Sequence, residues 1–92
     1  MSVGVMKFRL GRVCITDGAD AGLPAGEVRG ALARHAAGDW GECGAEDWQE
    51  NEFSLDKHLR LFSVYRSTDG VVFWVITEAD RSATTVLLPD EY

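Results

Sequence analysis

The chain has 92 residues and a formal net charge of −6 at pH 7. That length fits one domain, 1–92, and a composition of 46% hydrophobic and 26% charged residues is typical of a globular rather than a disordered protein. The acidic balance disfavours direct binding of nucleic acid, and the longest apolar stretch, 71–76, is too short to cross a bilayer.

The N-terminal residues carry no charged segment followed by an apolar one, so no secretory signal is predicted. We therefore expect a cytoplasmic protein, with Cys14 and Cys43 as reduced thiols, the alternative being a disulfide between them. Met6 is an alternative start of the chain, in which case residues 1–5 are a disordered extension.

The first half of the chain predicts one strand and one helix. Apolar and polar residues alternate over 6–16, and the alternation shifts by one residue at Gly11, which predicts a strand with a β-bulge there. The polar and glycine-rich residues 16–22 are typical of a loop. Apolar residues at helical spacing predict a helix over 24–37, ended by Gly38 as a left-handed cap.

The second half predicts a helix over 45–57 and then three strands, over 60–67, 71–77 and 84–88. A hairpin turn at 68–70 joins the first two of these strands, which places them in an antiparallel meander. The predicted fold is α+β, with the order β-α-α-β-β-β and two helices packed on one face of a four-stranded, mainly antiparallel sheet. The edge at which the first strand pairs stays open at this point.

The charge is concentrated in one segment. Residues 39–56 contain no Lys or Arg, and their acidic residues are Asp39, Glu42, Glu46, Asp47, Glu50, Glu52 and Asp56. One interpretation is a solvated helix face. The other is a binding surface for a basic partner, favoured because like charges four residues apart destabilise a helix by about 0.2–0.5 kcal/mol per pair.

Neither a metal site nor a catalytic site is predicted. The acidic residues lack the spacing of a calcium loop, and His35 and His58 have no motif partner. Serines such as Ser63 lack the sequence context of a nucleophile. We therefore expect a protein that is not an enzyme and needs no cofactor, with a metal-dependent nuclease as the disfavoured alternative.

Two further segments are candidate contacts for a partner. Trp40, Trp48 and Trp74 are all more typical of packing than of stacking on bases, and Trp40, between two glycines and expected to be exposed, is the best candidate to anchor an interface. The loop at 78–85 is either a satisfied turn, in which Asp80 caps the backbone and Arg81 pairs with Glu78, or a binding loop displayed by the sheet.

Residues 35–41 (HAAGDWG) and 74–92 (WVITEADRSATTVLLPDEY) resemble a family of small proteins carried by phages and plasmids. The resemblance covers about residues 8–92, and the chain departs from the family in its N-terminal extension and at Cys43. It implies an accessory protein of a mobile genetic element. Small acidic proteins in that setting resemble inhibitors of host defence, including type I anti-CRISPR proteins that prevent a surveillance complex from engaging DNA.

The leading hypothesis is therefore a non-enzymatic inhibitor, a monomer or weak dimer, that binds a basic nucleic-acid-handling surface of a host defence complex. Residues 39–56 would supply most of its contacts. The alternative is a small regulatory or structural phage or plasmid protein that acts by ordinary protein contacts through Trp40 and the 78–85 loop.

Overall fold

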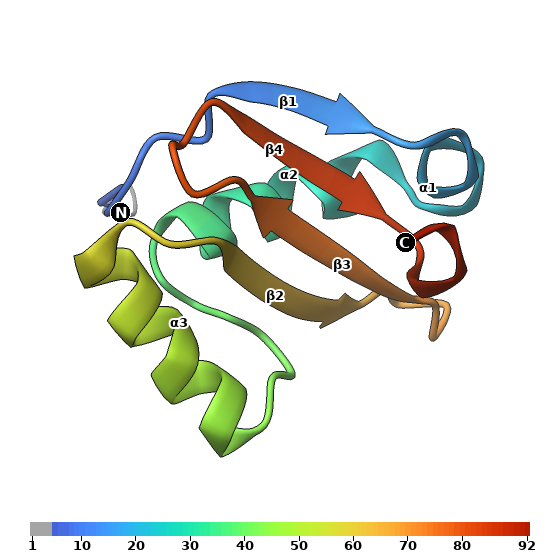
Figure 1. Ribbon diagram of the computed structural model, residues 1–92. Coiled ribbons are helices and arrows are strands. Elements are labelled where there is room, and N and C mark those ends of the chain that lie inside the picture. The colour runs from blue at the N-terminus through green and yellow to red at the C-terminus, as the bar shows by residue number, and fades with distance from the viewer. Residues whose placement is uncertain (1–4) are drawn as a thin grey trace.

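The computed structural model describes residues 5–92, which fold as an α+β domain, as predicted (Figure 1). Its elements are β1 (Arg12–Ile15), α1 (Asp17–Gly22), α2 (Ala25–Ala36), α3 (Ala45–Lys57), β2 (Leu61–Arg66), β3 (Val72–Thr77), β4 (Ala83–Leu87) and the 3-10 helix η1 (Pro89–Glu91). Except for Val5, the extension expected at 1–5 lies outside the described residues.

The sheet has the strand order β1-β4-β3-β2. Strands β2, β3 and β4 form the predicted antiparallel meander, and Gly70 has the positive φ of 84° that the hairpin turn requires. Strand β1 lies beside β4 and runs parallel to it, so the sheet is mixed and the expectation of a mainly antiparallel sheet is corrected. The helices between β1 and β2 return the chain to the end where β1 begins, which gives β1, β2 and β4 one direction.

The first strand is shorter than predicted. At Gly11 φ is +66°, and a Cβ there would lie 2.4 Å from the Ser82 backbone, so the chain turns tightly against the β3–β4 loop. Residues before Gly11 leave the sheet, and the Lys7 backbone N–H donates to the carbonyl of Ala36 over 2.7 Å. The shift in alternation at Gly11 therefore marks the start of the strand and not a bulge inside it.

The segment predicted as a loop contains a short helix, α1. The Thr16 side chain accepts a hydrogen bond from the Ala19 N–H over 3.3 Å, and Asp17 and Asp20 lie in the first turn, where the helix dipole favours acids. Ala19 is fully buried. Capping and burial thus outweigh the low helix propensity of glycine in this segment, and the loop prediction is wrong.

Helices α2 and α3 match their predicted ranges but cover different parts of the sheet. Helix α2 packs Val28 and Ala31 on the sheet face that carries Phe73 and Val75, and together they form the core. Trp74 alternates with Phe73 and Val75 along β3 and therefore lies on the other face of the sheet.

Helix α3 lies along the outer edge of β2, although both helices were expected on one face (Figure 1). Asn51 of α3 explains this position. Its side-chain amide donates to the Phe62 carbonyl over 2.6 Å and accepts from the Phe62 N–H over 2.9 Å. Only Asn51 and Ser54 are buried along the helix. Within residues 5–92 no α-helix covers the other sheet face, and the short 3-10 helix η1 contacts β3.

Candidate partner-binding site

The structure divides the acidic segment 39–56 into two groups. The first group has partners within the fold: Asp39 accepts from Arg34 over 2.7 Å, and Glu42 forms an ion pair with Arg66 at 3.2 Å. The hydrogen bond from Arg34 lowers the pKa of the Asp39 carboxyl below its usual value. These carboxylates are already compensated, so they contribute less to the attraction of a partner than the sequence suggests.

Trp40 is fully buried, and the expectation of an exposed anchor at this position is wrong. Its indole N–H donates to Glu52 over 2.7 Å, and its ring stacks on Phe8 with the ring centres 6.1 Å apart. Gly38 and Gly41, both with a positive φ, allow the chain between them to turn the Trp40 ring inward, against His35, rather than to display it. Trp40 is therefore a core residue that also holds one acidic side chain.

The second group lies on the outside of α3. Glu46, Asp47 and Glu50 are exposed, and within residues 5–92 no cation forms an ion pair with them. Asp56 lies further along, 3.6 Å from Lys57 of the same helix. Helical spacing places Glu46, Glu50 and Phe53 on one stripe, and Phe53 is 53% exposed. We call Glu46, Asp47, Glu50 and Phe53 the acidic α3 face.

Two contacts were predicted for the loop at 78–85, and the structure contains one of them as predicted. Asp80 caps the backbone as predicted, accepting from the Ser82 N–H over 3.0 Å. Arg81 pairs with Glu78 only through the backbone, because its guanidinium donates to the Glu78 carbonyl over 3.1 Å, while the Glu78 carboxylate lies 3.6 Å from Arg60. Arg81 has a positive φ of 63° and turns its side chain toward α3.

Arg81 fastens the C-terminal end of α3 to the sheet. Its guanidinium donates to the backbone carbonyls of Ser54 at 3.1 Å, Leu59 at 2.7 Å and Ala79 at 3.0 Å. The last carbonyls of a helix have no hydrogen-bond donor within the helix. A cation that donates to them therefore stabilises the helix end. Arg81 thus positions α3 and is committed to the fold.

A chain of buried polar side chains crosses the core beneath the sheet. Thr84 donates to the Leu10 carbonyl over 2.7 Å and therefore accepts from Thr77, 2.7 Å away. The Thr77 hydroxyl then accepts from His35 Nε2 over 2.8 Å, and His35 Nδ1 accepts from the Ser63 hydroxyl over 2.5 Å. The sequence of donors assigns His35 as the neutral tautomer with its proton on Nε2.

This contact between His35 and Ser63 places a nucleophile and a base together, which the sequence did not indicate. Both side chains are fully buried, however, and burial lowers the pKa of His35 to about 3. The His35 Nε2–H is directed to a threonine hydroxyl, so no carboxylate orients the ring as in a catalytic triad. In this geometry the chain of hydrogen bonds satisfies buried groups and specifies the core packing.

Across residues 5–92 no cluster of three or more His, Cys, Asp or Glu side chains is arranged to hold a metal ion. No helix in the same range is long and apolar enough to span a membrane. Cys14 and Cys43 are both free thiols.

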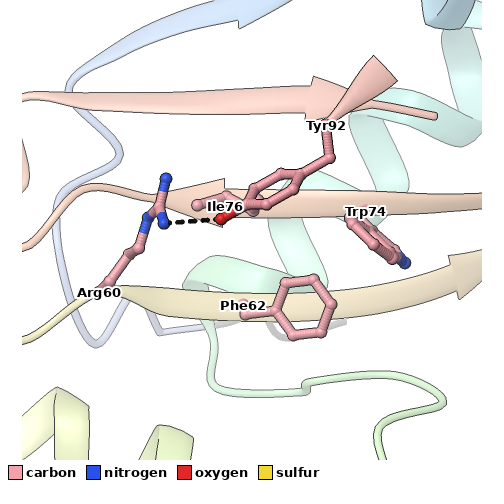
Figure 2. A pocket seen from close by; sticks show the side chains of 5 residues that line it. All are labelled: Arg60, Phe62, Trp74, Ile76 and Tyr92. Carbon is pink, nitrogen blue, oxygen red and sulfur yellow. Dashed lines mark hydrogen bonds between the residues drawn. The ribbon is translucent and has the colours of Figure 1, made fainter. Parts of the chain in front are cut away.

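A second candidate surface, which the sequence did not reveal, lies on the sheet face that no described α-helix covers. A cleft of about 290 Å³ on this face is lined by Arg60, Phe62, Trp74, Ile76 and Tyr92, whose side chains are drawn in Figure 2. Trp74 contacts Phe62 and Tyr92 edge-to-face, with ring centres 5.1 and 5.6 Å apart. We call this the open-face cleft.

Arg60 and Tyr92 form the wall of the open-face cleft. The Arg60 guanidinium donates to the Tyr92 hydroxyl over 3.0 Å and lies 5.8 Å from the centre of its ring (Figure 2). Tyr92 is 70% exposed. Alternation over 72–77 separates Trp74 from the core residues, but the sequence does not tell which sheet face remains uncovered. The sequence therefore predicts only a packing role for Trp74.

Comparison of the chain with models of protein families, with curated proteins and with solved structures gave no match.

Proposed function

We propose that the protein is a non-enzymatic binding domain that docks the acidic α3 face onto a basic surface of a partner protein. The observation that supports this most is that some acidic residues have partners within the fold and others do not. Asp39, Glu42 and Glu52 have partners within the fold, whereas Glu46, Asp47 and Glu50 have no described cation near them. A fold that holds uncompensated like charges on one rigid helix presents a negative field to the solvent.

Phe53 supports docking in addition to long-range attraction. It lies on the stripe of Glu46 and Glu50 and leaves 53% of its surface in solvent. Aromatic residues at the centre of an interface, ringed by polar groups, contribute much of the binding free energy. Charge would then set the rate of encounter and its salt dependence, and Phe53 would limit dissociation.

The partner class follows from the sign of the charge and from the resemblance described above. A basic surface that normally binds nucleic acid attracts an acidic helix for the same electrostatic reason that it attracts phosphates. The proposal is therefore an anti-CRISPR-like inhibitor from a mobile element, which occupies the DNA-binding groove of a host surveillance complex and contacts no nucleic acid itself.

The test compares two double charge reversals with the same change in net charge. Glu46→Lys/Glu50→Lys alters the acidic α3 face. Asp69→Lys/Asp90→Lys alters exposed acids elsewhere and serves as the matched control. In bacteria with an active type I CRISPR system, wild type and control should restore phage plating, and the α3 variant should not.

Binding kinetics against the purified surveillance complex complete the test. The wild-type association rate should fall steeply between low and high salt, and the α3 variant should associate more slowly at low salt. If wild type does not protect the phage, inhibition of this system is rejected. If both double variants bind and inhibit like wild type, the acidic α3 face is not the docking surface.

The open-face cleft favours a second candidate, a regulatory or structural interaction module that uses Trp74 and Tyr92 instead of α3. Replacing Tyr92 with Ala removes a wall of the cleft at an exposed position and leaves the core unchanged. Under this candidate Tyr92→Ala abolishes capture of a partner, while Glu46→Lys/Glu50→Lys does not. Under the main proposal the two outcomes are reversed.

A further inference from the structure

Strand β1 is an edge strand with apolar side chains and no cover. It occupies the end of the sheet opposite α3 (Figure 1). Val13 and Ile15 lie on the helix-facing side of the sheet, yet each is 41% exposed. Edge strands are usually protected from pairing with another chain by a short length, charged side chains, proline or a bulge. Strand β1 is short and carries the exposed Arg12, but it has no proline, no bulge and no charge on the side of Val13 and Ile15.

The backbone of β1 has hydrogen-bonding groups directed away from the sheet. The Arg12 N–H donates to Ser82 and the Thr16 N–H donates to Val86, both on the β4 side. Because backbone groups alternate in direction along a strand, those of Val13 and Ile15 point outward. Among residues 5–92 none forms a strand or bridge on that side.

This pattern is self-complementary. Two copies of β1 placed antiparallel, with Cys14 facing Cys14, bring Val13 of each copy opposite Ile15 of the other. Both residues have outward backbone groups, so each such pair exchanges two hydrogen bonds. Cys14 then occupies a non-hydrogen-bonded pair, in which the Cα atoms are about 4.5 Å apart.

Side chains also match across this axis. Beside Ile15 lies a groove of about 330 Å³, lined by Leu23, Ala25, Val28 and Leu32, with the charged Asp20 and Arg29 also in its lining. Val13 of the second copy would extend over this groove from its position opposite Ile15. The match removes apolar surface from water on the helix-facing side.

Charge is complementary on the opposite side. The same register places the exposed Arg12 opposite Thr16 of the second copy, whose hydroxyl donates to Glu91 over 2.5 Å, and next to the exposed Asp17. A guanidinium thus approaches two carboxylates at each end of the paired strands.

We propose that the protein associates with a second copy of itself through antiparallel pairing of β1, on a two-fold axis at Cys14. The two sheets join into one continuous sheet, and the acidic α3 faces lie at its two distant ends. The short strand buries little surface, so the association is weak and reversible.

The test uses Cys14 as a reporter of the register. The full chain is treated with diamide, which takes up the protons and electrons of two thiols as the S–S bond forms. A non-hydrogen-bonded pair has a Cα separation within the range of disulfides. Cys43→Ser should still give a cross-linked dimer, which peptide mass spectrometry assigns to Cys14–Cys14. Cys14→Ser should give none.

Two lysine variants in the Cys43→Ser background separate pairing from chance collision. Ile15→Lys places a charge in the pairing edge and should reduce the yield at least tenfold. Gln49→Lys adds the same charge on exposed α3 and should leave the yield unchanged. Arg12→Glu should lower the yield, and Asp17→Arg added to it should restore it. Circular dichroism verifies the fold of each variant.

Light scattering under reducing conditions gives an independent result. The average mass of wild type should rise with concentration toward that of two chains, and that of Ile15→Lys should stay at one. A wild-type mass of one chain at every concentration would overturn the proposal. Equal cross-linking of Ile15→Lys and Gln49→Lys, or cross-linking through Cys43, would do so as well.

Discussion

The two edges of the sheet differ in how their backbone groups are satisfied. On the β2 edge the Val64 N–H donates to Trp40, the Val64 carbonyl accepts from Glu42, and the Asn51 amide holds both backbone groups of Phe62. On the β1 edge no described residue pairs with the outward backbone groups of the strand. One edge is closed within the chain, and the other is available to a second chain.

The comparison also explains why the acidic segment 39–56 is divided. Its first part, around Trp40 and Glu42, runs beside β2 and closes that edge of the sheet. The negative charge of Glu42 is compensated there by Arg66. Its second part, α3, touches the edge mainly through Asn51 and turns its acidic residues outward. One segment therefore serves the fold on one side and is proposed to serve binding on the other.

The largest expected effect comes from breaking the closed edge at Gly41. Its φ is +72°, and a Cβ would lie 2.0 Å from the Val64 carbonyl oxygen. Gly41→Ala should lower the free energy of unfolding by about 3 kcal/mol or more, because backbone strain and a backbone clash add. Chemical denaturation measures it. Gly30→Ala in α2, where the Cβ meets nothing, is the control and should stabilise by about 0.5–1 kcal/mol.

Loosening α3 from the closed edge should have the next largest effect. Arg81→Lys keeps the charge but cannot reach the Ser54 and Leu59 carbonyls together, so we expect a loss of about 2 kcal/mol. Arg66→Lys, on an exposed ion pair, should change stability by less than about 1 kcal/mol. Equal losses in the two variants would contradict the anchoring role of Arg81.

The buried histidine beneath the sheet predicts a sensitivity to acid. The pKa of His35 is about 3 in the folded protein, below its ordinary value of 6.5, so only the unfolded chain gains the proton between these values. Stability is therefore complete above pH 6.5 and falls as the pH drops toward 3, by about 1.4 kcal/mol per unit.

Denaturation between pH 7 and pH 5 isolates this contribution, since carboxylates titrate mainly below that window. His35→Gln should flatten the slope, whatever its effect on stability at pH 7. His58→Gln, at an exposed position, should keep the wild-type slope. An unchanged slope in His35→Gln would show that another group carries the pH dependence.

Local patterns in the sequence predicted most elements, but not the edge contacts. Helical spacing and the Asp69-Gly70 turn determine α3 and the β2–β3 hairpin over short distances, and both agree with the structure. The pairing of β1 with β4 and the burial of Trp40 depend on contacts distant in sequence. In the sequence Asn51 looks like an ordinary helix residue, because its role depends on the position of β2 in the fold.

The candidate surfaces follow the same division. The charge of α3 is visible in the sequence, whereas the pairing of Asp39 and Glu42 with arginines is not. The open-face cleft and the uncovered β1 edge arise from where helices are absent, and alternation within a single strand carries no information about that.

The smallest expected effect on stability is at the open edge. Ile15→Lys changes a side chain that is 41% exposed, so the free energy of unfolding of the monomer should change by about 1 kcal/mol or less. Dilute denaturation of the two proteins measures the difference. A loss as large as that of Gly41→Ala would mean that β1 is closed within the chain in a way that the edge comparison excludes.

Hydrogen exchange of individual backbone amides tests the difference between the two edges most directly. At a concentration where light scattering gives the mass of one chain, the amides of Phe62 and Val64 should exchange slowly, and those of Val13 and Ile15 should exchange at nearly unprotected rates. At concentrations where the mass rises, Val13 and Ile15 should become protected. Slow exchange of Val13 and Ile15 in the single chain would contradict the account, because the β1 edge would then be closed like that of β2.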